Sequence, residues 1–207
     1  MKLQVAMDVL TTDDALALAA KVAPHVDIIE LGTPLIKNAG LSAVTAVKEA
    51  HPEHLVLADL KTMDAGELEA ALAFDAGADL VTVLGVAGDS TIAGAVAAGR
   101  ARSKGVVVDL IGVPDKVTRA REVVALGAEL VEMHAGLDEQ AEEGFTFETL
   151  LTDGSTSGVT FAVAGGVSAA TVAAVQDSGA SIAVAGGAIY GADDPAAAAA
   201  EIRAALR

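Results

Sequence analysis

The sequence contains no cysteine and no tryptophan, and it has only one tyrosine and four phenylalanines among 207 residues. The absence of cysteine excludes disulfides and thiolate metal sites. The scarcity of aromatic side chains removes the stacking surfaces on which single-stranded nucleic acid is bound. No uncharged apolar run reaches about 18 residues, so we expect no membrane-spanning helix. No targeting segment is recognisable at the N-terminus, and we expect a cytoplasmic protein.

Positive charge is also scarce. Lysine and arginine total 13 against 29 aspartates and glutamates, and the formal net charge is −16. A chain of this charge is repelled by a phosphate backbone, so we expect no nucleic-acid partner. A small anionic ligand is repelled at long range as well. Such a ligand therefore requires a local positive potential at its binding site.

Short apolar segments alternate with longer alanine-rich segments along the whole chain. The short segments are rich in valine, isoleucine and leucine, and their hydrophobic residues follow one another almost without interruption. Such runs are typical of strands buried on both faces, as in a parallel sheet. The strands predicted in this way are Leu3–Asp8, Val26–Gly32, Leu55–Lys61, Asp79–Gly85, Val106–Gly112, Glu129–His134, Val159–Ala164 and Ile182–Gly186.

A helical pattern follows each predicted strand. Gly77, Gly127 and Gly179 stand where a helix is expected to end and the next strand to begin, as a left-handed helix cap requires. The mean spacing of about 26 residues suffices for one strand, one helix and two short loops. The helices are predicted near residues 13–24, 40–50, 66–76, 89–103, 115–126, 138–151, 168–178 and 194–206.

Eight such units predict an α/β fold, a single-domain (β/α)₈ TIM barrel over residues 1–207. The alternative is a doubly wound open sheet. That alternative is less favoured because it rarely needs eight evenly spaced strands, and no G-x-G-x-x-G follows the first one. No linker rich in serine, glycine or proline divides the chain, which favours one domain.

Ionisable side chains stand near the C-terminal ends of the predicted strands, where barrels of this kind place their active sites. Polar groups in apolar strands are costly to bury without partners, so their repeated presence points to one shared site rather than to separate surface positions. The residues in question are Asp8, Glu30, Asp59, Lys61, Asp109 and His134.

Two of these carboxylates are candidate metal ligands. Glu30 and Asp59 lie on neighbouring predicted strands and offer the hard oxygen ligands that Mg²⁺ prefers. Lys61 lies two residues after Asp59, on the same face of the strand, where an ammonium can stabilise oxyanion charge or move a proton. A Schiff-base role is the competing interpretation. The surrounding carboxylates favour the charged amine and argue against that role.

His134 is a candidate general acid or base, since it ends the sixth predicted strand. Two glycine pairs, Gly165-Gly166 and Gly186-Gly187, follow the seventh and eighth strands. Barrels of this kind commonly bind phosphate at that place through backbone N–H groups. Glycine allows the backbone to approach the anion closely, so the pairs predict a phosphate site.

The same residues carry a resemblance to a known family. Residues 56–66 contain D-x-K-x-x-D, formed by Asp59, Lys61 and Asp64, which is the signature of the orotidine 5′-phosphate decarboxylase suprafamily. Within this suprafamily the whole chain resembles the 3-hexulose-6-phosphate synthases. Residues 29–34, 81–85 and 134–140 and both glycine pairs carry that similarity.

The resemblance implies an aldehyde-lyase that depends on Mg²⁺, with Mn²⁺ able to replace it. It would condense formaldehyde with D-ribulose 5-phosphate to D-arabino-hex-3-ulose 6-phosphate through a 1,2-enediolate, and run in reverse. The base at C1 stays open. The resemblance assigns Glu30 and Asp59 to the metal, Lys61 and Asp8 to substrate and intermediate, Asp109 and His134 to proton transfer, and Asp64 to the partner's site in a homodimer.

Two departures separate the chain from a related decarboxylase branch, which acts on 3-keto-L-gulonate 6-phosphate. Where that branch has arginines, this sequence has Leu137 and Gly187. Both departures favour the synthase, and they leave phosphate binding to backbone groups. A sugar-phosphate binder without catalytic activity is a third alternative, but the intact set of carboxylates and lysine disfavours it.

Overall fold

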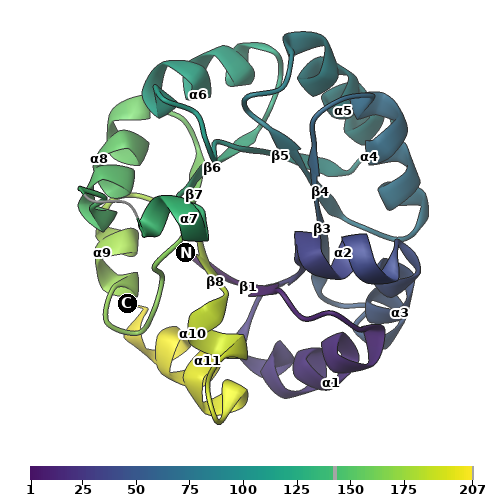
Figure 1. Cartoon of the computed structure of the whole chain (residues 1–207), viewed down its shortest axis with the longest axis vertical. Coiled ribbons are helices and arrows are strands. Elements are labelled where there is room, and N and C mark those ends of the chain that lie inside the picture. The colour runs from purple at the N-terminus through teal and green to yellow at the C-terminus, as the bar shows by residue number, and fades with distance from the viewer. Residues whose placement is uncertain (142–143, 207) are drawn as a thin grey trace.

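The computed structural model describes residues 1–141 and 144–206, and it forms a closed barrel of parallel strands (Figure 1). Each strand pairs with the next one along the chain, and the first pairs with the last. The predicted barrel is therefore confirmed. Its strands are β1 (Lys2–Met7), β2 (Ile28–Leu31), β3 (Leu55–Thr62), β4 (Leu80–Leu84), β5 (Gly105–Asp109), β6 (Leu130–His134), β7 (Phe161–Ala164) and β8 (Ile182–Ala185).

Helices surround the barrel as an outer ring (Figure 1). Seven predicted helices match α1, α3, α4, α5, α6, α9 and α11 to within a few residues at most ends. Their bounds are α1 (Thr12–Val22), α3 (Ser42–Ala50), α4 (Gly66–Asp75), α5 (Asp89–Arg102), α6 (Lys116–Ala125), α9 (Val172–Asp177) and α11 (Pro195–Ala205). A short 3₁₀ turn, η1 (Ala23–His25), follows α1.

The helix predicted over 138–151 is wrong. The structure has α7 (Leu137–Gln140) and α8 (Phe147–Ser157) there, while residues 142–143 lie outside the described residues. Gly144, between the two helices, has φ +95°, which a continuous helix does not permit. Two further short helices, α2 (Thr33–Ala39) and α10 (Gly187–Tyr190), were not predicted, because they are too short for a clear hydrophobic period.

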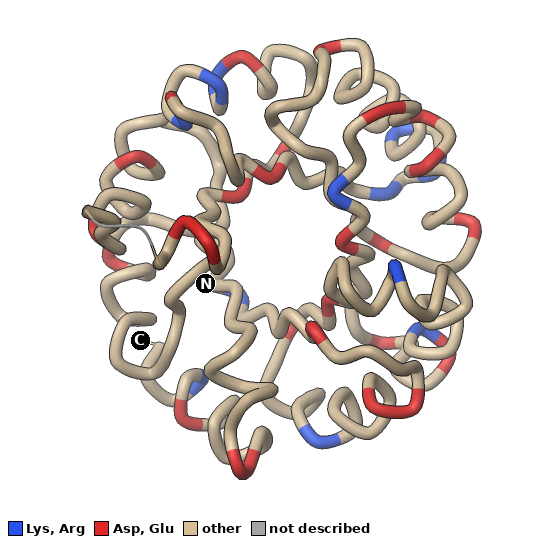
Figure 2. The backbone as a smooth tube through the Cα atoms, viewed as in Figure 1, with Lys and Arg blue, Asp and Glu red and all other residues tan. Residues whose placement is uncertain are grey.

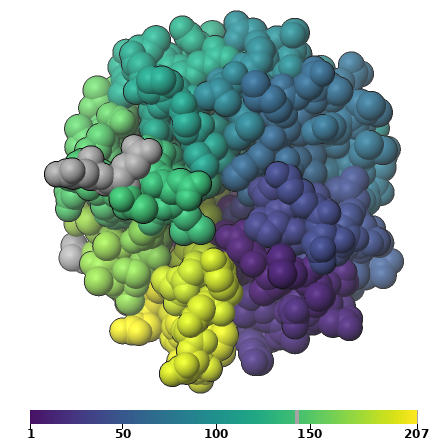
Figure 3. Space-filling view, viewed as in Figure 1, coloured from purple at the N-terminus to yellow at the C-terminus, as the bar shows by residue number. Residues whose placement is uncertain are grey.

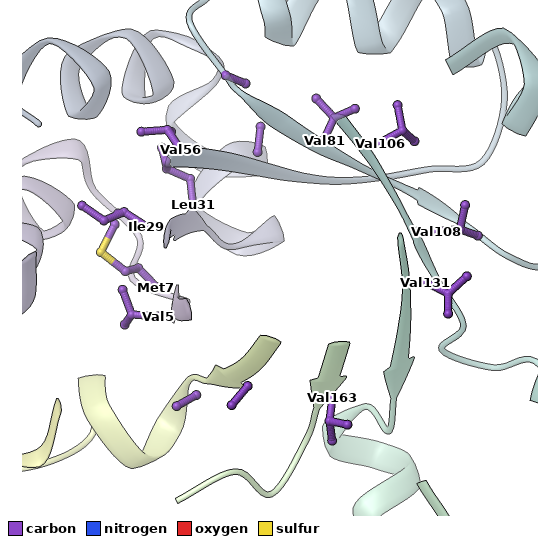
Figure 4. Packing of buried hydrophobic residues seen from close by; sticks show 14 of the residues in the cluster. Val5, Met7, Ile29, Leu31, Val56, Val81, Val106, Val108, Val131 and Val163 are labelled. Carbon is purple, nitrogen blue, oxygen red and sulfur yellow. The ribbon is translucent and has the colours of Figure 1, made fainter. Parts of the chain in front are cut away.

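The core has two shells, because successive strand residues point to opposite faces. The outward-facing residues, such as Val5, Ile29 and Val131, pack against the helices (Figure 4). A smaller cluster that includes Ile28, Leu57, Val107, Ala162 and Val184 forms a separate group. No helix in the described part of the chain is both long and apolar enough to cross a membrane.

The short helices α2, α7 and α10 lie at one end of the barrel (Figure 1). At the centre of this face the surface is depressed, and the segments around α7, α10 and β1 border the depression (Figure 3). Acidic positions occur on the outer helices and also on the inner strands (Figure 2). The negative charge of the chain is thus not confined to the outer surface.

Asp79 joins several elements at the start of β4. Its carboxylate accepts hydrogen bonds from the amines of Lys48 at 2.8 Å and Lys104 at 2.5 Å, and from the backbone N–H of Val56 at 3.0 Å. Burial opposes the ionised form, but the two ammonium groups outweigh it and lower the pKa of Asp79. Its side chain is only 14% exposed, so these bonds are little screened by solvent.

We predict that Asp79→Asn destabilises the protein by about 2 kcal/mol at pH 7, because two half-buried amines lose their carboxylate. Since folding lowers this pKa, the contribution is present above the ordinary value of 3.8 and disappears as the pH falls through the folded pKa. Urea unfolding at several pH values measures both effects. The control Asp75→Asn removes an exposed pair with Arg102, so it should cost less than about 0.5 kcal/mol. Equal losses in both variants would contradict the prediction.

Candidate active site

Side chains from three strands meet inside one end of the barrel. Asp59 and Lys61 come from β3, Asp109 from β5 and His134 from β6. Lys61 Nζ lies 2.9 Å from Asp59 Oδ2 and 2.8 Å from Asp109 Oδ2. The structure thus brings these four predicted site residues into one hydrogen-bonded network.

Asp59 is held by hydroxyl groups on both sides. Thr33 Oγ1 donates to Asp59 Oδ2 at 2.6 Å, and Thr82 Oγ1 donates to Asp59 Oδ1 at 2.6 Å. All three residues are buried. Because both carboxylate oxygens are engaged, the Asp59 side chain has one fixed orientation. Neither threonine was among the predicted site residues.

Asp109 is fully buried and accepts from three sides. Lys61 donates to it, the backbone N–H of Ile111 donates at 2.9 Å, and His134 Nδ1 lies 3.0 Å from each of its oxygens. Burial opposes ionisation, yet the interactions with His134 and with the ammonium of Lys61 hold the pKa of Asp109 well below its ordinary value. An ionised carboxylate only accepts, so His134 Nδ1 carries the proton and Nε2 can accept another.

Lys61 has an unusual backbone. Its φ is +46°, in the left-handed region that non-glycine residues rarely adopt, and the pairing of β3 with β4 shifts register between Ala58 and Thr62. The Lys61 N–H donates to Thr82 Oγ1 at 2.9 Å, which helps to hold this conformation. Burial opposes the charged amine, but Asp109 and Asp59 outweigh it and raise the pKa of Lys61. The lysine is therefore an ammonium, not a free amine nucleophile.

Glu30 and Asp8 complete the predicted carboxylates. Glu30 on β2 accepts from Gln4 Nε2 at 2.7 Å, and burial together with the charge of Asp59 raises its pKa to about 8. Asp8 lies exposed just after β1, where partial burial and the charge of Asp59 raise its pKa. The charge of Asp59 raises the pKa of both groups, so the three carboxyl groups lie close enough to repel one another.

Glu132 is a site residue that the sequence reasoning missed. It is 4% exposed and lies on β6, with Oε1 3.4 Å from His134 Nδ1. Burial and the charges of Asp109 and Glu30 raise its pKa well above the ordinary value. The signal was available, because a residue two positions before His134 on a strand shares its face.

Asp109, Glu132 and His134 each offer an atom that could hold a metal ion, and these atoms lie within 4.8 Å of one another. Two of them, however, already bind each other, and Asp109 also accepts from Lys61. Asp59 is engaged in the same way, since it accepts from Lys61, Thr33 and Thr82, so both sets of carboxylates are already hydrogen-bonded in this structure.

Asp64 does not join this network. It is exposed after β3, and its Oδ1 accepts from the backbone N–H of Ala65 at 2.8 Å. It lines a surface cavity of about 580 Å³ between α4 and α5. Among the described residues, Asp64 forms no hydrogen bond or ion pair with the other predicted catalytic residues.

The glycine pairs lie next to each other in the barrel, since β7 pairs with β8. Gly165 and Gly166 have φ of +93° and +85°, and a Cβ on Gly165 would overlap the carbonyl oxygen of Ala135. Only glycine fits there without strain. Gly186 and Gly187 follow β8 and begin α10. This geometry allows close approach of a ligand to the backbone.

The comparisons with known proteins cover the whole barrel. The model of the orotidine 5′-phosphate decarboxylase / HUMPS family matches residues 1–202. A 3-hexulose-6-phosphate synthase of Mycobacterium gastri is 69% identical over 206 residues, covering 100% of both chains. A crystal structure of a 3-hexulose-6-phosphate synthase is 70% identical, with a TM-score of 0.99 and 100% coverage of both chains. The structure of a 3-keto-L-gulonate-6-phosphate decarboxylase from Vibrio cholerae is 30% identical, with a TM-score of 0.86, covering 99% of this chain and 96% of that one.

We predict that Lys61→Met destabilises the ligand-free protein by about 2 kcal/mol, because Asp59 and Asp109 lose a partly buried counter-charge. Urea unfolding measures this loss. The control Lys21→Met replaces an exposed lysine on α1 and should change stability by less than about 0.5 kcal/mol.

Neutralising a nearby carboxyl should compensate. Adding Asp109→Asn to Lys61→Met should recover part of the lost stability, because Asp109 is then no longer an ionised, buried carboxylate without its ammonium partner. If Lys61→Met is as stable as the unmodified chain, the ammonium does not balance these carboxylates.

Proposed function

The chain belongs to the orotidine 5′-phosphate decarboxylase / HUMPS family, and from this premise we propose that it condenses formaldehyde with D-ribulose 5-phosphate. The product is D-arabino-hex-3-ulose 6-phosphate, and the reaction is reversible. The 69% identity to a 3-hexulose-6-phosphate synthase over the full length carries the proposal. The network of Asp59, Lys61, Asp109 and His134 supplies the groups that an aldol reaction needs.

We propose that Mg²⁺, or Mn²⁺ in its place, is the cofactor, held by Glu30 and Asp59. Both are buried and offer hard oxygen ligands, and the raised pKa of Glu30 marks an excess of negative charge. A divalent cation would relieve that excess, so the donor set fits the metal. When bound, it supplies Lewis-acid stabilisation of negative charge on the sugar oxygens.

The side chains divide the remaining work. His134 Nε2 accepts the proton from C1 of the pentose phosphate, because Asp109 fixes the proton on Nδ1 and orients the ring. Lys61, held as an ammonium, donates hydrogen bonds to the resulting enediolate. Carbon C1 then attacks formaldehyde, and the new alkoxide takes up the proton held on His134 Nε2, which restores the neutral imidazole. Asp8, at the mouth, contacts the substrate hydroxyls.

The phosphate group would rest on the backbone N–H groups at Gly165-Gly166 and Gly186-Gly187. Because Asp8 and the buried carboxyl groups of the site add to the net charge of −16, a local potential from backbone dipoles, Lys61 and the metal would have to outweigh them. Formaldehyde carries no charge and requires no such potential.

The assay that tests the function follows formaldehyde in the presence of Mg²⁺. The purified protein should consume it only when D-ribulose 5-phosphate is also present. No consumption, with or without metal, would contradict the proposal. Release of CO₂ from 3-keto-L-gulonate 6-phosphate in large excess over aldol activity would favour the decarboxylase instead.

The metal assignment has its own variant. Glu30→Gln should lower kcat/KM at least about 100-fold, because it removes a charged ligand, and the dependence on Mg²⁺ should weaken. The control Glu53→Gln neutralises an exposed carboxylate before β3 and should leave both unchanged. Circular dichroism of both variants checks that the barrel stays folded. Unchanged activity of a folded Glu30→Gln protein would remove Glu30 from the metal site.

We further propose that the protein is a homodimer in which Asp64 reaches the partner's site. Large apolar side chains are exposed beside Asp64: Met63 is 55% exposed, Leu68 62% and Leu72 52%. Such a group on α4 and the loop before it is costly to leave in water, and a second copy of the same face would cover it.

Mixing two inactive variants tests this arrangement. Asp64→Asn and Glu30→Gln should each lose activity alone, since each spoils a different part of one shared site. Unfolded together and refolded as an equal mixture, they should regain about a quarter of normal activity, because half of the dimers are hybrids with one intact site. No recovery, although hybrids form, would mean that Asp64 acts within its own protomer.

A further inference from the structure

Tyr190 is a polar group at the mouth of the barrel to which the proposed mechanism assigns no role. It is the only tyrosine of the chain, and it ends α10, the short helix that begins at the second glycine pair. Side chains on a helix lean toward its N-terminus, so a residue three or four positions later points back over the first ones. Tyr190 should therefore lie over Gly186 and Gly187.

The distances around the glycine pair agree with a Tyr190 side chain that points back over it. A Cβ placed on Gly186 would lie 3.5 Å from Tyr190 Cε1, and one placed on Gly187 would lie 3.8 Å from the Tyr190 hydroxyl oxygen. The ring therefore runs along the glycine pair, and its hydroxyl lies beside Gly187. The same Gly186 Cβ would lie 3.5 Å from the carbonyl oxygen of Ala6, so Gly186 itself lies beside β1.

The charge around the ring points to the same place. Partial burial and then the negative charge of Asp8 raise the pKa of Tyr190, so the phenol keeps its proton and can donate it in a hydrogen bond. Tyr190 thus lies within the field of the Asp8 carboxylate and beside the glycine pair that follows β8.

The hydroxyl is available for a ligand. It has no hydrogen-bond partner among the described residues, and it is not a buried polar atom, so it is accessible to solvent. Gly187 is itself exposed, and no side chain of its own separates the hydroxyl from the backbone N–H groups there. An anion bound to this backbone would lie within reach of a neutral donor.

We propose that the Tyr190 hydroxyl donates a hydrogen bond to the phosphate group of the sugar substrate at the second glycine pair. The proposal rests on the phosphate assignment of the proposed function and adds a side-chain donor to it. A neutral donor suits this place, since it adds a bond to the anion without attracting Asp8. Tyr190 is thus a binding residue and takes no part in proton transfer at C1.

The composition of the chain offers a direct test. With no tryptophan and one tyrosine, the tyrosine emission of the full-length protein comes from Tyr190 alone. Titration with inorganic phosphate and with D-ribulose 5-phosphate should change this emission until it saturates, whereas D-ribulose without phosphate should leave it unchanged at the same concentrations. Saturating kinetics with D-ribulose 5-phosphate and no change in emission would overturn the proposal. Because the phosphate titration needs no turnover, it also gives an answer if the protein fails to consume formaldehyde.

A variant separates contact from mere proximity. Tyr190→Phe should raise KM for D-ribulose 5-phosphate, and the inhibition constant of inorganic phosphate, about tenfold, with kcat within about twofold, because one hydrogen bond to a charged group is lost. The control is Ser178→Ala. Ser178 follows α9 and its hydroxyl donates to the carbonyl of Val175, so its loss should leave both constants unchanged. Unchanged constants in Tyr190→Phe would overturn the proposed bond even if the emission responds to phosphate. If the variant fails to fold, the titration of the unmodified protein decides.

Discussion

The ammonium of Lys61 between Asp59 and Asp109 is the interaction on which the site depends. It joins the side chains of β3 and β5 at 2.9 and 2.8 Å, and through Asp109 it connects to His134 on β6. Carboxyl groups outnumber the positive charges around it. Burial, together with these neighbouring negative charges, raises the pKa of both Glu30 and Glu132. This imbalance supports the proposed divalent cation, which would complete the charge balance that Lys61 begins.

The barrel makes this arrangement possible because it fixes the ends of distant strands within a few ångströms of one another. The hydrophobic contacts between the strands and the outer helices hold the strands in place, so the inner face can carry polar residues that would be unfavourable in an ordinary core. Hydrogen bonds from nearby side chains stabilise them: Thr33 and Thr82 donate to Asp59, and Gln4 donates to Glu30. The strained backbone of Lys61, with φ +46°, persists at the centre of the same network.

Prediction from the sequence succeeded where the signal is local. Apolar runs indicated every strand, and the two-residue spacing of Asp59 and Lys61 placed both on the third strand, where the structure has them in contact. It failed where a residue is defined by its neighbours in space. Glu132 was overlooked although it shares the face of His134, and the helix over 138–151 was wrong because Gly144 interrupts it. Tyr190 had no motif of its own, and the role proposed for it follows only from its position beside Gly187.

The sequence by itself determined the barrel, the strand ends and the residue types that meet there, because hydrophobic periodicity and glycine positions act over a few residues at a time. It also determined the absence of cysteine chemistry and the large negative charge. Only the tertiary structure decided which of these groups touch. That Lys61 binds both Asp59 and Asp109, and that Asp64 does not join them, depends on the register and bulge of strands far apart in the chain. Those relations follow from closure of the whole barrel, and no single segment contains them.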